Sequence, residues 1–546
     1  MPCEQGSSSS VETQPLLKET PATYHSVDDL SQPLSSDTES ITPPPLNNFS
    51  QGDISWILAG LWSAVFLGAL GTVMATLLTP IGSDFNKSNL ASYLGTSYLL
   101  SLCCFTPLYG RLADILGRKG AMLLALFLFG SGTILCGMVP SMEMLIFARA
   151  IAGMGGGGVM TVSTIVVTDL IPLKQRGLYQ GMANILYGLG AGLGGPVGGW
   201  INDVFGWRSA FFFQTPLLIF SAALVAWKVN IQLPSEMQDQ PLHEKLRRID
   251  VLGSLTLVGA VGCFLLAFSL KTTEEIPWTH PLVYGLSVAS FLCGILFILV
   301  EKYWAPFPVM PLRLMTRRTP LAVSVSNLFA SMTAFSMLYN VPLYLSAVKL
   351  YSATSAGSHL VPHSIAIPCG SVAAGWLMRR TGKLYTLTVA TAASSVFANL
   401  LVIFWNENTA PWHFWFDLIP QAFGMASFIT TTLIAMIAGV FKEEMPVATG
   451  ITYLFRTTGQ VLGVSLSGAI LQGVLLQKLR ERIRVPNSAE VGFLHSAASI
   501  RNLDPQWRKA AIDSYADALH VVFIFQGVMA FLALLTCLAI KENPLP

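Results

Sequence analysis

The sequence predicts an all-α protein that crosses a membrane many times, and two observations lead to this fold class. Of its 546 residues, 52% are hydrophobic and 11% are charged, whereas soluble domains carry roughly 25% charged residues. Apolar windows of ~20 residues, the length that crosses ~30 Å of hydrocarbon as a helix, recur from Trp56 almost to the end. We count about fourteen windows, at 55–80, 90–109, 121–140, 143–168, 178–202, 208–231, 251–270, 281–300, 320–346, 355–378, 384–405, 413–440, 447–476 and 517–540.

The windows group into two six-helix halves with two extra spans between them. We expect an N-terminal half at 53–231, a connecting segment with the extra spans at 232–319, and a C-terminal half at 320–546 with a long outer loop at 477–516. Residues 1–52 are rich in Ser, Thr, Pro, Asp and Glu. Such a segment cannot bury enough apolar surface to fold, so we predict a disordered tail.

Lys and Arg in the short connections predict the orientation. Most of them gather on one side of the membrane, whereas the short loops opposite hold only Lys87, Arg208, Lys271 and Lys349. Because positively charged loops stay in the cytosol, we expect both termini there. Segment 477–516 is an exception, because it carries seven Lys and Arg residues on the predicted outer face. A miscounted number of spans would produce the same exception.

The first motif, GRLADILGRKG, follows the second window. Gly110 and Gly117 lie seven residues apart, and Asp114 precedes Arg118 by one helical turn, so the carboxylate and the guanidinium can pair. A degenerate copy, GWLMRRTGK, occupies the matching loop of the second half, as a parallel internal repeat requires. An ordinary positively charged loop with a helix cap is the alternative interpretation.

A second motif, GLGAGLGGPVGGW, contains seven glycines and one proline. Glycines four residues apart form ridges along which neighbouring helix backbones can touch, and packing inside a membrane tolerates the proline. Simple close packing and a pliable helix at a moving seam are the two interpretations. The residues concerned are Gly188, Gly192, Gly195, Pro196 and Gly199.

Two arginines lie inside predicted spans. Arg149 is part of FARAIAGMGGGG, and Arg456 is part of YLFRTTGQVLG. A charge at such a depth costs at least ~2.5 kcal/mol, so each guanidinium should face a cavity or a partner. A buried ion pair that serves packing alone is the alternative.

Together these motifs resemble the major facilitator superfamily over about 55–540. GRLADILGRKG is similar to that family's loop between spans two and three, FARAIAGMGGGG to its fourth-span motif, and GLGAGLGGPVGGW to its fifth-span antiporter motif. The match points to the fourteen-spanner drug:proton antiporters, which include multidrug and metabolite efflux pumps. The resemblance implies that Asp114 and Arg118 latch one state of an alternating-access cycle, and that Arg149 takes part in proton coupling. ASYLGTSYLLS, and Gln214 in FFFQTP, look similar to fungal vacuolar basic amino-acid transporters.

The first window departs from the family pattern. It reads FLGALGTVMATLLTP, and Gly71 or Thr72 stands where relatives usually carry an acid. Glu143, Asp169 and Asp417 all lie near the ends of spans. Because a desolvated cation needs a counter-charge, these positions favour a neutral, amphiphilic or anionic substrate over a cationic one.

Several polar side chains inside spans are candidates for a cavity. His359 and His363 share a helix face; packing or pore-lining polarity is one interpretation, and proton coupling through His363, which titrates near neutral pH, is another. Further ligands for a metal are missing, so no metal site is predicted. Roughly half of the other polar positions should form interhelical hydrogen bonds instead. The cavity candidates are Asn184, Tyr187, Gln214 and Asn340.

Two short signals bear on location. Glu12 with Leu16 and Leu17, in ETQPLLKE, resembles an acidic dileucine sorting signal for the vacuole. Asn86 begins an Asn-Lys-Ser glycosylation acceptor that lies very near the bilayer. The plasma membrane and the vacuolar membrane both stay open.

The sequence therefore predicts a proton-coupled secondary transporter that exports a small organic solute, such as an amphiphilic metabolite or drug, from the cytosol. A vacuolar basic amino-acid/proton antiporter is the alternative, and a nutrient sensor with a transporter fold is a third class. No nucleophile–His–acid arrangement or phosphate-binding G-x4-GK[ST] loop indicates an enzyme or an ATP-driven pump. We expect a monomer without cofactor, with a small-molecule substrate, protons and the bilayer as partners, and with no nucleic acid because the net charge is only +2.

Overall fold

The structure is a computed structural model in which every described element is helical. It describes residues 50–542 apart from 86–89, 91, 231–249, 274–275, 277–278, 306–307, 352, 407 and 483–504. The sorting residues Glu12, Leu16 and Leu17 and the glycosylation acceptor Asn86 lie outside the described residues.

The N-terminal part forms helices at the positions of the six predicted spans. The first begins at Ser50, whose hydroxyl accepts a hydrogen bond from the backbone N–H of Asp53, and a 3-10 turn interrupts it. Gly206 ends the fifth with φ +81°, which only glycine adopts easily. The elements are α1 (Gln51–Ala69), η1 (Leu70–Thr72), α2 (Val73–Asp84), α3 (Ser92–Ile115), α4 (Gly117–Met138), α5 (Met142–Leu170), α6 (Leu173–Phe205), α7 (Ser209–Phe212) and α8 (Thr215–Lys228).

The rest of the chain supplies two extra helices and a second set of spans. The extra pair is α11 (Val251–Thr273) and α12 (Pro281–Tyr303). The second set is α13 (Leu312–Thr316), α14 (Arg318–Ala347), α15 (Ala353–Ser358), α16 (Val361–Thr381), α17 (Tyr385–Ile403), α18 (His413–Phe416), α19 (Ile419–Ala438), η3 (Lys442–Glu444), α20 (Met445–Arg482) and α22 (Pro505–Cys537).

The predicted membrane fold class is confirmed. Among the described residues, twelve helices are long and apolar enough to cross a membrane. Helix α3, with 24 residues, covers 92–109 of the predicted span 90–109, and α6, with 33 residues, contains the predicted span 178–202. The many Ser, Thr, Tyr and Gly residues of these helices lower their hydropathy. The count of fourteen therefore stays a prediction.

Two helices extend into the predicted outer loop 477–516. Helix α20 continues to Arg482, and α22 begins at Pro505. Both ends of the predicted outer loop 477–516 are thus helical, and 483–504 lies outside the described residues. Arg482 donates to Asp517 across the two helices at 2.8 Å, and this ion pair joins the two helix extensions.

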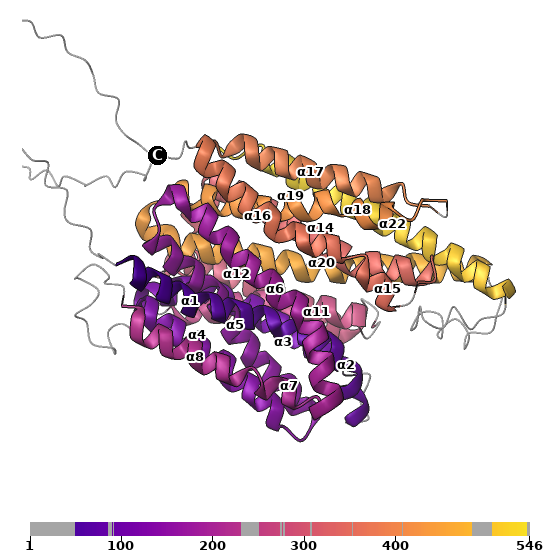
Figure 1. Ribbon diagram of the computed structural model, residues 1–546, viewed down its shortest axis with the longest axis horizontal. Helices are drawn as coiled ribbons and strands as arrows, with labels where there is room; N and C mark the ends of the chain where they lie inside the picture. The colour runs from indigo at the N-terminus through magenta and orange to yellow at the C-terminus, as the bar shows by residue number, and fades with distance from the viewer. Residues whose placement is uncertain are drawn as a thin grey trace, which may run out of the picture.

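The two sets of spans lie side by side (Figure 1). Helix α3 packs against α20, and α6 packs against α16, so these two seams join the N-terminal and C-terminal sets. Helix α11 packs against α12, α3 and α20, and therefore covers one seam. Below, the motif end is the end of the bundle at which α3 meets α4, around Asp114 and Arg118, and the far end is the opposite one.

Candidate functional site

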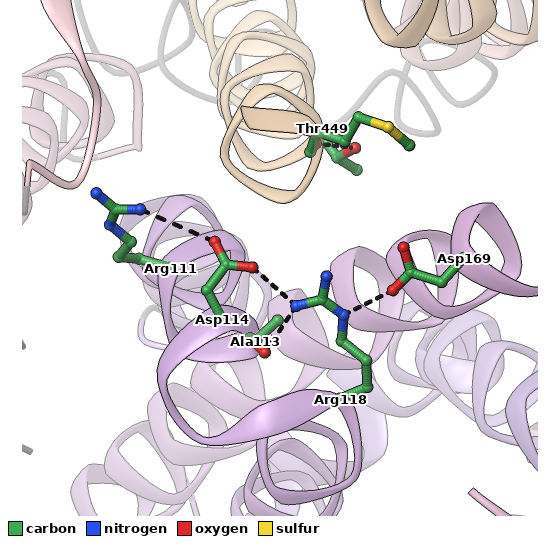
Figure 2. A network of polar contacts seen from close by, with 7 residues as sticks. Arg111, Ala113, Asp114, Arg118, Asp169 and Thr449 are labelled. Carbon is green, nitrogen blue, oxygen red and sulfur yellow. Dashed lines mark hydrogen bonds and ion pairs between the residues drawn. The ribbon is translucent and has the colours of Figure 1, made fainter. Parts of the chain in front are cut away.

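The first motif forms an ion-pair network at the motif end (Figure 2). Arg118, at the start of α4, donates from Nη1 to Asp114 Oδ1 at 2.8 Å and from Nε to Asp169 Oδ2 at 2.7 Å. It also donates to the carbonyl oxygen of Ala113 at 2.8 Å. Arg111 approaches the second oxygen of Asp114 at 3.9 Å. The predicted contact of Asp114 with Arg118 is present. Asp169 on α5 is a further partner of Arg118, although its sequence position indicated only that it lies near the end of a span.

Removing the Arg118 guanidinium should destabilise the protein strongly. Its side chain is 7% exposed, and both carboxylates would lose their closest cation. Breaking such a buried arrangement typically costs about 3–5 kcal/mol, so we expect Arg118→Ala to lower the unfolding temperature in detergent clearly. Lys478→Ala is the matched control, because its partner Glu481 is 50% exposed and exposed pairs contribute ~0–1 kcal/mol. Equal melting curves for both variants would contradict the buried network.

Both seams are closed by backbone contacts near the motif end. A Cβ on Gly110 would lie 2.7 Å from the carbonyl oxygen of Pro446, and a Cβ on Gly375 would lie 2.5 Å from the carbonyl carbon of Gly177. No side chain fits at such distances, so these glycines let α3 meet α20 and α6 meet α16 directly. Gly117, a second glycine of the first motif, has φ +80° and allows the tight turn between α3 and α4.

Polar contacts continue along the seams toward the middle of the membrane. Asn184 Nδ2 on α6 donates to Ser371 Oγ on α16 at 2.6 Å. Thr164 Oγ1 on α5 lies 2.8 Å from the Tyr453 hydroxyl on α20. The cavity candidate Asn184 therefore bridges the two sets of spans, as one of the predicted interhelical hydrogen bonds.

Arg456 lies next to these contacts. Its Nη2 donates to Asn327 Oδ1 on α14 at 3.3 Å, and its guanidinium carbon lies 4.8 Å from the centre of the Tyr453 ring. The Tyr187 side chain on α6 is 41% exposed and lies in the neighbourhood of Tyr453 and Arg456. We call Tyr187, Tyr453 and Arg456 the central cluster.

Arg149 lies nearer the far end and has a similar environment. Its Nε donates to the carbonyl oxygen of Leu94 at 3.3 Å, and its guanidinium carbon lies 4.4 Å from the centre of the Tyr98 ring. Each intramembrane arginine thus faces a tyrosine ring and donates to an uncharged oxygen.

Among the described residues, the buried carboxylates lie away from both arginines. Asp417 accepts from Trp405 Nε1 at 2.9 Å and lies 3.0 Å from His413 Nδ1, at the far end of α19. Glu301, in the last turn of α12, accepts a hydrogen bond from the backbone N–H of Met310, which follows the helix, at 3.1 Å. The ion pairs of the described chain include none to Arg149 or Arg456. Among the described residues, no ion pair therefore neutralises Arg149 or Arg456.

The other candidate residues are scattered. His363 Nε2 lies 3.0 Å from Gln421 Oε1. Asn340 donates to Ser336 and Ser467 inside the C-terminal set. Gln214 donates to the carbonyl oxygen of Ala210 in its own turn. The structure places Asn340 and Gln214 in packing contacts rather than beside the central cluster, so their role in a substrate cavity stays a prediction.

The second motif lies wholly within the continuous helix α6. Gly188, Gly192, Gly195, Pro196 and Gly199 all belong to it. A Cβ on Gly190 would lie 2.5 Å from the carbonyl oxygen of Phe66 on α1, so close packing accounts for this glycine. A Cβ on Gly188 would have only Pro368 nearby, at 3.9 Å, and one on Gly199 would have nothing within 4 Å.

Comparison with known proteins adds the following. Residues 61–464 match the profile described as Major Facilitator Superfamily. The multidrug resistance protein fnx1 of Schizosaccharomyces pombe is 36% identical, over 89% of this chain and 92% of that protein. Vacuolar basic amino acid transporter 1 of Saccharomyces cerevisiae is 32% identical, over 81% of this chain and 83% of that protein. The crystal structure of the human organic anion transporter MFSD10 (TETRAN) matches with a TM-score of 0.55 at 14% identity, over 87% of this chain and 98% of that one. At that identity the match shows the fold alone.

Proposed function

We propose that this chain, which belongs to the Major Facilitator Superfamily, is a proton-coupled exporter that moves a neutral or anionic amphiphilic solute out of the cytosol. Members of this superfamily are multi-pass membrane transporters rather than enzymes. The observation that carries the proposal is the central cluster, where Arg456 offers a positive charge, Tyr453 and Tyr187 offer aromatic surface, and no ion pair of the described residues neutralises the arginine. A desolvated anion is stabilised there, and a desolvated cation is not.

We place the motif end in the cytosol, because the Lys and Arg of the short connections gather there. The backbone contacts at Gly110 and Gly375 then close the cytosolic side. Alternating access requires these contacts to break in the second state. We assign Asp114 and Arg118 to holding the closed state, because their network joins the ends of α3, α4 and α5.

Protons supply the driving force in this proposal. Arg149 and Arg456 cannot release a proton at physiological pH, so we assign them to binding substrate charge and to shifting the protonation of nearby groups. His363 is the titratable candidate within a span. One chain holds both seams and the central cluster, which supports a functional monomer.

A vacuolar basic amino-acid antiporter is the second candidate. The observation that favours it is the 32% identity to a protein named as a vacuolar basic amino acid transporter. Against it stands the positive central cluster, which would repel lysine and arginine.

Transport by purified protein in liposomes with an imposed pH gradient separates the two candidates. We expect gradient-driven, saturable uptake of tritiated hexanesulfonate, none of tritiated lysine, and loss of uptake in Arg149→Ala, because that variant removes one of the two intramembrane cations. Lysine uptake that collapses with the gradient, without sulfonate uptake, would establish the vacuolar amino-acid function and overturn the proposal.

A further inference from the structure

A cavity of about 480 Å³ lies at the motif end, beside the α3–α20 seam, and we call it the motif-end cavity. The last turn of α12, the chain that follows it, the short helices α13 and η3, and the first turn of α20 form its wall together with Arg111 of α3. Cavities that hold small organic ligands measure ~300–1,000 Å³. The motif-end cavity is therefore large enough for a small solute, and its lining residues differ from those of the central cluster.

Glu301 is the most buried charged side chain of this wall, with 7% of its surface exposed. Its Oε1 accepts from the backbone N–H of Met310, whereas its buried Oε2 has no hydrogen-bond partner among the described residues. The ion pairs within the described chain include none to this carboxylate. Because a buried charge without a partner is unfavourable, a positively charged group in the cavity would stabilise Glu301.

The wall as a whole carries both signs of charge in equal number. Glu444 is bound by Arg313 and by Arg317, whose Nη1 lies 3.2 Å from Glu444 Oε2. Lys302 is exposed, and the ion pairs of the part of the chain that the structure describes include none to its ammonium. A wall of mixed sign is complementary to a zwitterion rather than to a ligand with a single charge. The charged lining residues are Arg111, Lys302, Arg313, Glu301, Glu443 and Glu444.

Part of the wall is apolar. Val447 of α20 is 3% exposed, and half-buried Pro311 and Leu312 lie at the start of α13. Apolar surface favours an aliphatic group of the ligand, because contact removes both from water. A ligand that matches every part of the wall therefore carries one positive group, one negative group and an aliphatic side chain.

We propose that the motif-end cavity binds a free α-amino acid with an aliphatic side chain, whose ammonium meets Glu301 and whose carboxylate meets Lys302. Hydrogen bonds between such ionised groups are charge-assisted and therefore strong. The site is separate from the central cluster, so the proposed binding does not depend on which solute the protein transports. Leucine is the probe, because its side chain matches the apolar wall at Leu312 and Val447.

The position of the cavity links its occupant to the closed state. Arg111 of α3 and Val447 of α20 both line it, and they directly follow Gly110 and Pro446, whose backbone contact closes the seam. Opening the motif end would separate these two parts of the wall. Because a ligand shifts a protein toward the state that it binds better, bound leucine should hold the seam closed and slow transport. This consequence for transport rests on the proposed export.

Equilibrium binding of tritiated leucine to the purified protein in detergent tests the site without transport. We expect saturable binding. The competitors 4-methylpentanoate, which lacks the ammonium, and 3-methylbutylamine, which lacks the carboxylate, should each bind at least ~10-fold more weakly, equivalent to ~1.4 kcal/mol. Absence of saturable leucine binding, or equal competition by either analogue, would overturn the proposal.

Two variants locate the bound leucine. Glu301→Gln removes the charge and keeps an oxygen that can accept from Met310, so it should weaken leucine binding ~10-fold or more. Glu481→Gln is the matched control, because Glu481 is an exposed acid at the far end. Lys302→Met alters an exposed side chain and should weaken binding of leucine but not of 3-methylbutylamine. Unchanged leucine binding in Glu301→Gln would place the ligand elsewhere and refute the site.

Transport tests the link to the closed state. Leucine on both sides of the liposome membrane should slow gradient-driven uptake of hexanesulfonate ~10-fold, and it should have little effect on the Glu301→Gln protein. Leucine that binds to the unmodified protein without slowing uptake would refute this link. Absence of hexanesulfonate uptake without leucine would refute the proposed export instead, and the binding measurements would still decide the site.

Discussion

A leucine at Gly375 should hold the protein open at the motif end and stop transport. The added Cβ would lie 2.5 Å from the backbone of Gly177, and a helix backbone cannot move aside as a flexible side chain can. We expect uptake to fall ~10-fold or more. The direct readout is Cys103, whose buried thiol lies 3.1 Å from Thr458 in the α3–α20 seam. It should become reactive to a water-soluble maleimide, as detected by peptide mass spectrometry.

The matched control for this variant is Gly199→Leu. Nothing lies within 4 Å of a Cβ at Gly199, so this substitution leaves the motif end closed and Cys103 protected. Protection of Cys103 in Gly375→Leu as well would show that the seams do not have to separate together, and would contradict the alternating-access assignment.

Removing the charge of Arg456 should abolish uptake of anions. A charge-assisted hydrogen bond contributes about 1.5–3 kcal/mol, so Arg456→Met should lower anion uptake ~10- to 100-fold. Asn327→Asp tests the same charge while keeping the arginine. Its new carboxylate would stand where the amide oxygen now accepts from Arg456 at 3.3 Å, and would neutralise the central cluster.

Arg456→Met and Asn327→Asp should therefore both lose anion uptake, although only the first removes the arginine. Asn340→Ala is the control, because the hydrogen bonds of Asn340 to described residues are made with Ser336 and Ser467 and not with Arg456. Normal anion uptake in Asn327→Asp would show that the positive charge does not select the substrate.

The sequence predicted the parts of the molecule that depend on local spacing. The helices follow from apolar length, and the contact of Asp114 with Arg118 follows from their separation by one turn. The family resemblance is confirmed by the relatives and by the profile match. Asp169 could not be predicted as a partner of Arg118, because 51 residues separate them.

The polar residues inside spans show a second limit. In lipid both faces of a helix are apolar, so periodicity does not reveal which face meets a neighbour. The roles of Asn184, which crosses between the sets of spans, and of Asn340, which packs within one set, were therefore indistinguishable. The interruption of the first span at Leu70–Thr72 was also hidden, because glycine inside a membrane helix does not by itself mark a break.

The position of α11 has a consequence for the motion between states. It packs against both α3 and α20, so separating those helices would require stripping an apolar surface from one of them. Among the described residues, the extra helices α11 and α12 pack elsewhere, and the α6–α16 seam is held at the motif end by glycine backbone contacts and the bond of Asn184 to Ser371. The change of state should therefore be asymmetric: α11 stays on one of the two helices of the α3–α20 seam while the other moves away from it, and the larger displacement lies at α6 and α16.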